Sequence, residues 1–143
     1  MAKSLQHELK KREPFRLPEE EATLNVLRTA GVLVGRLSAL FKQAGLSHPQ
    51  YNILRILRGA GDPGLPCQEV AARMVTREPD VTRLIDRLEQ SGWVRRERST
   101  SDRRVVLLSI TPAGRNLLGG LDEPVAELHR LASMGAKGSA GGG

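Results

Sequence analysis

The chain has 143 residues, of which 39% are hydrophobic and 3% aromatic, and it carries a formal net charge of +6. This length is enough for one domain with a hydrophobic core, and the shortage of aromatic rings argues against a single-strand nucleic-acid binder that stacks bases. The basic excess favours an anionic partner, either nucleic acid or an acidic membrane surface.

The sequence offers little material for catalysis or metal binding. Its single cysteine, Cys67, cannot form an internal disulfide, and His7, His48 and His129 lack metal-ligand spacing. We find no glycine-rich phosphate loop and no nucleophile paired with a base. We therefore expect a protein that is not an enzyme, binds no metal and uses no cofactor.

Membrane and export signals are also missing from the sequence pattern. No apolar run approaches the roughly 20 residues of a membrane span, and residues 1–15 lack the apolar core of a signal peptide. We therefore expect a cytoplasmic protein that has no membrane partner.

Residues 1–17 are polar and mildly basic, and we expect an N-terminal arm there. Helical spacing begins at Pro18, and the acidic run Glu19–Glu21 in the first turn favours a helix start. Two apolar stripes follow within residues 18–46: Val26, Ala30, Leu33, Leu37 and Leu40 in one, and Leu24, Leu27, Val34 and Phe41 in the other. A helix with two apolar stripes packs on two sides, so we predict a dimerisation helix.

The next helix has a clear start signal in the sequence. Ser47 and Gln50 match a capping box, and Pro49 suits the first helical turn. The glycine-rich stretch 59–64 is predicted to end this helix as a loop.

Two further helices are expected before the chain changes to strands. The first is short, from Pro66 to Met74, and the second runs from about Glu78 to Ser91. Four residues of the second helix have the i, i+3, i+4, i+7 spacing of a buried face: Val81, Leu84, Ile85 and Leu88. Its outward face carries Asp80, Arg83, Asp86 and Arg87.

Residues 93–98 and 105–110 are predicted as two strands joined by a turn at 99–102. A hairpin that follows two short helices with a tight link is typical of a winged helix-turn-helix. The expected fold class is therefore mainly α with a small β-hairpin wing, in which a winged helix-turn-helix over residues 47–111 has flanking dimerisation helices.

A last helix is predicted to start at Thr111 and Pro112, which suit its cap and first turn. Glycines and Pro124 weaken it, so we expect a shortened C-terminal dimerisation helix over residues 112–134 and a flexible tail over 135–143.

Three stretches of the sequence form a recognisable set of motifs. They are residues 81–89 followed by Gly-Trp-Val at 92–94, the wing motif Asp-Arg-Arg at 102–104, and residues 107–115. With these motifs, residues 47–118 resemble the multiple-antibiotic-resistance regulator (MarR) family of winged helix-turn-helix transcription regulators.

The resemblance implies a homodimer whose first and last helices intertwine, and whose two winged domains bind a palindromic double-stranded operator. Such regulators usually repress nearby genes and release DNA when a small, often aromatic effector binds between the dimer region and the DNA-binding lobe. Family members usually continue into a final helix where this chain turns to glycine, serine and alanine. We therefore expect an altered effector pocket and a dimer that rests mainly on the first helix and the N-terminal arm.

The helix that opens at Pro79 is the predicted recognition helix. Arg83 can read guanine through two hydrogen bonds, while Thr76 and Thr82 can contact phosphate or a thymine methyl group. The alternative is that these residues only solvate an exposed face, but the basic hairpin that follows favours DNA. The DNA-binding candidates around this helix are Thr76, Arg77, Pro79, Asp80, Thr82, Arg83 and Arg87.

The predicted wing carries five arginines, Arg95, Arg96, Arg98, Arg103 and Arg104, against Glu97 and Asp102. DNA phosphate would supply the missing counter-charge, and a wing-tip arginine can enter the narrow minor groove. By resemblance, Arg104 is that arginine and Asp102 orients it through an ion pair. Arg98 and Arg103 are further DNA-binding candidates, and a solvated basic hairpin is the alternative.

Three residues invite other functions. His48 and Tyr51 lie where family pockets have polar walls, so they are candidates for effector contact, with ordinary packing as the alternative. Cys67 begins a short helix, whose N-terminus can lower a thiol pKa and favour oxidant sensing. We favour a structural role for Cys67, because buried structural cysteines are common.

The same fold could also serve other functions. A winged-helix module that binds protein instead of DNA often lacks an arginine-rich wing, so the wing argues against it. Repressor and activator differ in operator position, which the sequence does not contain, and neither the effector nor the operator sequence can be deduced.

Overall fold

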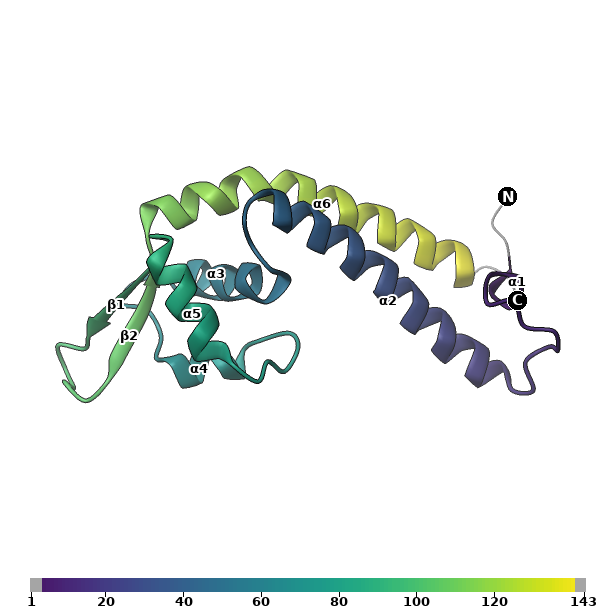
Figure 1. Ribbon diagram of the computed structural model, residues 1–143, viewed down its shortest axis with the longest axis horizontal. Coiled ribbons are helices and arrows are strands. Elements are labelled where there is room, and N and C mark those ends of the chain that lie inside the picture. Colours follow the sequence, from purple (N-terminus) through teal and green to yellow (C-terminus); the bar gives the residue numbers. More distant parts are fainter. Residues whose placement is uncertain (1–3, 141–143) are drawn as a thin grey trace.

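The computed structural model describes residues 4–140, and two long helices dominate it (Figure 1). A lobe of short helices and a hairpin lies at one end, and the two long helices extend from it and diverge (Figure 1). In chain order the elements are α1 (Leu5–Glu8), α2 (Pro18–Gln43), α3 (His48–Ala60), α4 (Cys67–Ala72), α5 (Val81–Gln90), β1 (Val94–Arg98), β2 (Val106–Ile110) and α6 (Pro112–Ala140). The predicted class, mainly α with a hairpin wing, is confirmed.

The start of α3 shows how the sequence sets a helix boundary. The Ser47 side chain accepts a hydrogen bond from the Gln50 backbone N–H at 3.2 Å, and the Gln50 side chain accepts one from the Ser47 N–H at 3.0 Å. The predicted capping box is therefore present, with a proline in the first turn. It satisfies two backbone donors that a helix N-terminus otherwise leaves unpaired.

The lobe has a single core to which both long helices contribute. Phe41 near the end of α2 stacks on Tyr51 of α3, with ring centroids 4.0 Å apart. On α5, the predicted inward face is buried except for Leu84, which is partly buried. The side chains that are almost fully buried in this core are Phe41, Ile53, Leu54, Leu57, Val70, Ile85, Leu88, Leu108 and Leu118.

The hairpin is antiparallel, with Val94 opposite Ile110 and Arg98 opposite Val106. Leu65 adds a bridge to β2, because its N–H and C=O both pair with Leu108 at 2.9 and 2.7 Å. Gly64 precedes this bridge with φ of 99°, and a Cβ there would collide with the Leu108 carbonyl oxygen. The close approach of the two backbones therefore requires glycine.

The last helix is tied to the lobe by an ion pair. The two terminal guanidinium nitrogens of Arg58 on α3, Nη1 and Nη2, donate to the Asp122 carboxylate on α6, each at 2.9 Å. This hydrogen bonding holds the pKa of Asp122 below its usual range. The pair lies where α6 leaves the lobe and begins the half that extends beside α2.

The last helix is also longer than predicted. It runs to Ala140, so the expected end near Met134 is wrong and residues 135–140 are helical; residues 141–143 of the expected tail lie outside the described residues. Glycine lowers helix propensity by about 1 kcal/mol relative to alanine, yet it keeps the backbone N–H. Pro124 removes one N–H, and the helix continues through it.

Smaller boundary differences have similar local causes. The helix α5 begins at Val81 instead of near Glu78, because the Asp80 carboxylate accepts the Arg83 N–H at 3.2 Å and acts as the N-cap. The helix α3 continues to Ala60, one residue into the stretch predicted as a loop. It ends there because Gly61 has a φ of 65°.

The helix α2 has an exposed apolar surface. By length and composition alone it could cross a membrane, because an 18-residue window within it has a mean hydropathy of 1.3. Only 11% of that window is buried in the structure. Arg28 and Arg36 interrupt the apolar run of this helix, as the sequence indicated, so its hydropathy is a property of the average over the window. Its large exposed apolar side chains are Val26, Leu27, Val32 and Val34.

Candidate nucleic-acid interface

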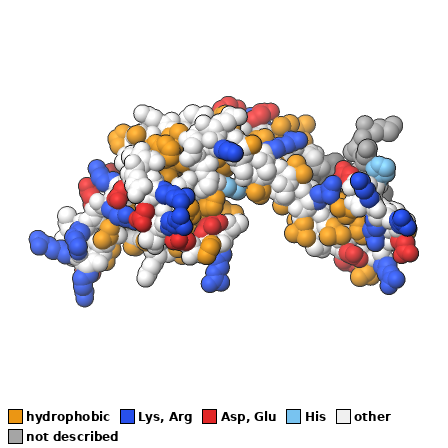
Figure 2. Space-filling model, in the orientation of Figure 1, with side chains coloured by type: hydrophobic (Ala, Val, Ile, Leu, Met, Phe, Trp, Pro, Cys, Tyr) orange, Lys and Arg blue, Asp and Glu red, His pale blue; other side chains and the backbone are white. Residues whose placement is uncertain are grey.

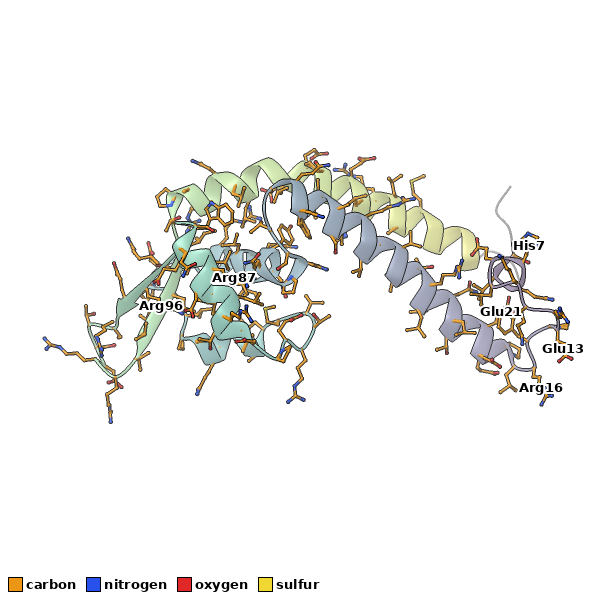
Figure 3. The ribbon with its side chains drawn as sticks, viewed as in Figure 1. His7, Glu13, Arg16, Glu21, Arg87 and Arg96 are labelled. Atoms are coloured by element: carbon orange, nitrogen blue, oxygen red, sulfur yellow. The ribbon has the colours of Figure 1, made fainter. Side chains whose placement is uncertain are left out.

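The surface around α5 combines exposed polar residues with arginines that have no internal partner. Within residues 4–140, Arg77, Arg83 and Arg87 form no ion pair with an acidic side chain (Figure 3 labels Arg87). The predicted candidates on this surface are all exposed: Thr76, Arg77, Pro79, Asp80, Thr82, Arg83 and Arg87. Arg83 and Arg87 lie on α5 and Arg77 on the loop before it, and guanidinium groups that lack an acidic partner in this part of the chain are suited to phosphate and base edges.

Two of these residues have local structural tasks. Asp80 caps α5 through its carboxylate, so its position is explained by the helix start. The Thr76 hydroxyl donates to the Glu78 carboxylate at 3.4 Å, within the same loop. Thr82 lies on the exposed side of α5, with its hydroxyl 3.9 Å from the Cys67 sulfur.

The wing tip has the predicted arrangement of Asp102 and Arg104. Asp102 accepts from the Arg104 backbone N–H at 3.1 Å and from its Nε at 3.3 Å. The Arg104 side chain is 91% exposed despite this pair. Its guanidinium is thus oriented from one side and open to solvent on the other.

The remaining wing arginines divide into engaged and projecting groups. Arg95 pairs with Glu97 at 3.1 Å, while Arg98 donates to the Arg103 carbonyl at 2.9 Å and so braces the turn. Arg103 has no acidic partner among residues 4–140 and is exposed. Basic side chains accordingly project from the hairpin end and the underside of the lobe (Figure 2).

The sequence analysis did not predict the role of Arg96. It grouped Arg96 with the wing arginines whose counter-charge would come from DNA phosphate. This side chain crosses from β1 to α5, where it contacts Asp86 and donates to Glu89 at 3.1 Å (Figure 3). The hydrogen bond to Asp86 raises the pKa of Arg96 further above its ordinary range. Arg96 therefore joins the wing to α5, and no periodic pattern in the sequence signals a contact between these two elements.

A cavity of about 600 Å³ lies between α2 and the lobe. Its walls come from α2, from the start of α3 and from the loop before α5, and they include His48, Lys42 and Asn52. Tyr51 is not in this wall; it is 6% exposed and packs in the core, where burial raises its pKa. The structure thus places His48 at the cavity and supports the packing alternative for Tyr51.

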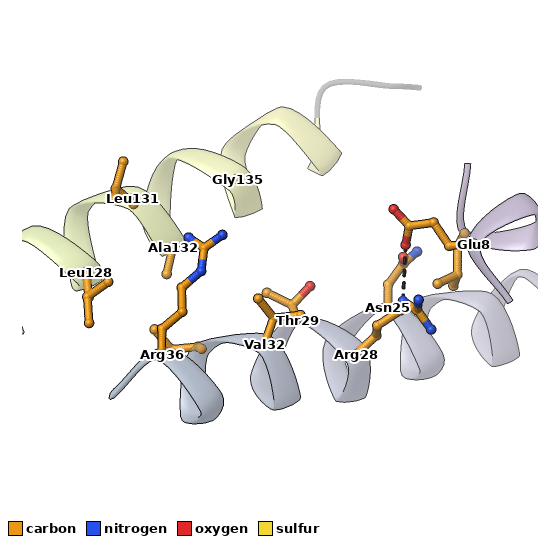
Figure 4. Close-up of a pocket in the computed structure, with 12 residues that line it drawn as sticks. Glu8, Asn25, Arg28, Thr29, Val32, Arg36, Leu128, Leu131, Ala132 and Gly135 are labelled. Carbon is orange, nitrogen blue, oxygen red and sulfur yellow. Dashed lines mark ion pairs between the residues drawn. The ribbon is translucent and has the colours of Figure 1, made fainter. Parts of the chain in front are cut away.

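A second cavity, of about 290 Å³, opens between the diverging halves of α2 and α6 (Figure 4). An ion pair of 3.1 Å between Glu8 and Arg28 lies at its α1 end (Figure 4). Apolar side chains from both long helices, including Val32 and Leu131, line it. Both are large apolar residues that the chain by itself leaves exposed.

A winged helix-turn-helix with long flanking helices is the class that this geometry defines. A family model described as the MarR family matches residues 46–106. The transcriptional regulator PecS of Dickeya dadantii is 35% identical over 115 residues, which cover 78% of this chain and 69% of that protein. The chain belongs to the MarR family of transcription regulators.

Solved structures agree with this assignment. A MarR transcription factor from Planctomyces limnophilus has a TM-score of 0.73 at 37% identity, covering 89% of this chain and 92% of that one. Sco3205 of Streptomyces coelicolor, solved in complex with DNA, has a TM-score of 0.70 at 28% identity, covering 85% and 78%. The match to the regulator YfiV of Bacillus subtilis, 35% identical over 70% of this chain, covers only 59% of that protein.

Proposed function

We propose that this protein is a sequence-specific regulator that binds double-stranded DNA as a homodimer in the cytoplasm and catalyses no reaction. The observation that carries the proposal is that one lobe presents both the arginines of α5, which have no acidic partner within residues 4–140, and the projecting Arg104 of the wing. The complex of Sco3205 with DNA, 28% identical to this chain, supports it.

The helix α5 supplies the sequence reading in this proposal. Arg83 lies in its first turn and is exposed, so its planar guanidinium can form two hydrogen bonds with guanine in the major groove. Arg77 precedes the helix and Arg87 lies one turn further along, where both can neutralise phosphates. Arg104 enters the adjacent minor groove, whose negative potential attracts arginine.

The homodimer follows from the apolar surface that one chain leaves open. Leu27 and Val26 on α2 are 62% and 67% exposed, and Met134 on α6 is 70% exposed. A partner's helices packed along the exposed apolar faces of α2 and α6 would cover such residues, and each large side chain fully buried is worth about 1.5–3 kcal/mol. Two-fold symmetry then favours a palindromic site with half-sites about one DNA turn apart.

The cavity between α2 and the lobe is the proposed effector site. Its apolar walls suit a ring, while Lys42 and His48 suit a carboxylate or phenol. Among relatives, the structure of NadR holds 4-hydroxyphenylacetate and that of CouR from Rhodococcus jostii holds p-coumaroyl-CoA, at 25% and 27% identity. We propose a repressor that a small aromatic acid releases from DNA, by analogy with the homoprotocatechuate operon repressor of Escherichia coli, which is 25% identical.

A titration of labelled duplexes from the region upstream of the gene, at two salt concentrations, tests the DNA-binding proposal. Arg83→Ala should relax the preference at one base-pair position in each half-site, with a loss of about 1–3 kcal/mol in discrimination. Arg16→Ala is the matched control, because Arg16 lies at the opposite end of the molecule (Figure 3).

Two results would count against this assignment. If Arg83→Ala weakens all sequences equally, Arg83 contacts phosphate only. If the wild-type protein shows no preference among duplexes at either salt concentration, the proposed function is wrong, and a winged-helix module that binds protein becomes the better description.

A further inference from the structure

The loop between α4 and α5, residues 73–80, is weakly attached to the rest of the lobe. Within residues 4–140, one hydrogen bond connects the main chain of residues 75–79 to another element: the Val75 N–H donates to Oδ1 of Asn52 on α3 at 2.9 Å. Burial of the Val75 side chain adds little, because it is 82% exposed. Met74, at the start of the loop, packs against the core. Beyond it, the main chain of residues 75–79 is held to another element, within residues 4–140, by this one side-chain acceptor.

The same asparagine belongs to the cavity between α2 and the lobe. Asn52 lines it together with Val75, Thr76 and Glu78 from the loop, and Ser38 and Lys42 line the α2 side. The loop that leads to α5 is thus one wall of the cavity. A molecule in the cavity would lie against both partners of the hydrogen bond that holds the loop.

We propose that Asn52 is a positioning residue that couples occupancy of this cavity to the placement of α5. In this structure, Asn52 Oδ1 accepts from the Val75 N–H, and the loop that follows leads to Asp80, the N-cap of α5. An occupant that moves the Asn52 side chain away from Val75 breaks this hydrogen bond and frees the main chain of residues 75–79. The coupling rests on the proposed DNA-binding function, whereas the holding of the loop does not.

The first experiment compares Asn52→Ala with Asn52→Asp, which keeps an oxygen that can accept from the Val75 N–H. Hydrogen–deuterium exchange of residues 73–80 in the free full-length protein should be faster in Asn52→Ala, with exchange in α3 unchanged, and Asn52→Asp should restore slow exchange. Affinity for the preferred duplex should fall about three- to tenfold in Asn52→Ala, in line with the loss of one hydrogen bond. Unchanged exchange or unchanged affinity in Asn52→Ala would overturn the proposal.

The second experiment uses a tethered occupant, so that no effector needs to be known. In a Cys67→Ser background, Ser38→Cys is alkylated with N-phenylmaleimide, which places an aromatic ring at the cavity. Ala39→Cys carries the same label as the matched control, because Ala39 is exposed and does not line the cavity. Circular dichroism and mass in solution confirm that the labelled proteins keep their fold and assembly.

Labelling at position 38 should lower DNA affinity about tenfold when Asn52 is present and less than twofold in Asn52→Ala, since the variant has already lost the coupling. An equal loss in both backgrounds, or no loss in either, would overturn the coupling through Asn52. If the unmodified protein binds no duplex, the proposed function fails as well, and the exchange comparison still decides whether Asn52 holds the loop.

Discussion

The arginines of the lobe differ in whether a carboxylate lies beside them. Arg96 contacts two carboxylates and Arg95 one, whereas Arg83 and Arg103 have no acidic partner within residues 4–140. A guanidinium that already has carboxylate partners gains less free energy from contact with a phosphate than a guanidinium that has no such partner. The number of arginines in the wing is therefore larger than the number that are free to bind DNA phosphates.

The exposed Arg104 gives a prediction at the residue scale. Arg104→Ala should weaken binding to all duplexes alike and flatten the dependence of log K on log salt by about one charge. Titrations at four salt concentrations measure this slope. An unchanged slope would show that Arg104 does not neutralise a phosphate in the complex.

At the scale of elements, Arg96 makes α5 and the wing one unit. Arg96→Ala should reduce affinity for the preferred duplex roughly fivefold, because α5 and Arg104 lose their fixed offset. The salt slope should stay as in the wild type, since Arg96 contributes no phosphate contact. The loss of stability should be about 1 kcal/mol or less, because the pair is partly exposed and screened. A slope that falls as in Arg104→Ala would instead place Arg96 on the DNA.

A second contact between elements, the packing of the start of α6 against the hairpin, can be tested at Gly114. A Cβ on Gly114 would lie 2.5 Å from the Trp93 carbonyl oxygen and 2.7 Å from Cγ1 of Ile110. Gly114→Ala should therefore destabilise the protein by about 1–3 kcal/mol in a denaturant titration. Gly119→Ala, at a helix position with open space, should instead stabilise by up to about 1 kcal/mol. Equal effects of the two substitutions would contradict this packing.

The sequence predicted those elements whose signals are local. The capping box at Ser47 and the buried face of α5 each depend on residues within one helix. The ion pair between Asp102 and Arg104, in contrast, was expected from the family resemblance. Contacts between distant segments carry no such signal, so the bridging by Arg96 and the bond from Val75 to Asn52 came only from the structure. Composition also misled: glycines near the C-terminus suggested a tail where α6 continues.

At the scale of the whole molecule, the two long helices diverge (Figure 1). Large apolar side chains on both of them are left exposed. Leu27→Asp should shift the protein from dimer to monomer, because a buried charge without a partner costs several kcal/mol at an interface. Analytical ultracentrifugation measures the shift, and circular dichroism shows whether the chain stays folded. A dimer as tight as that of the wild type would place the interface elsewhere.

Because half-sites in a palindrome need two lobes, the most direct test of the account is the mass of the protein–DNA complex. Native mass spectrometry on a preferred palindromic duplex should show two chains per duplex, and a duplex with one half-site scrambled should bind far more weakly. A single chain bound with equal affinity to both duplexes would contradict the dimeric regulator.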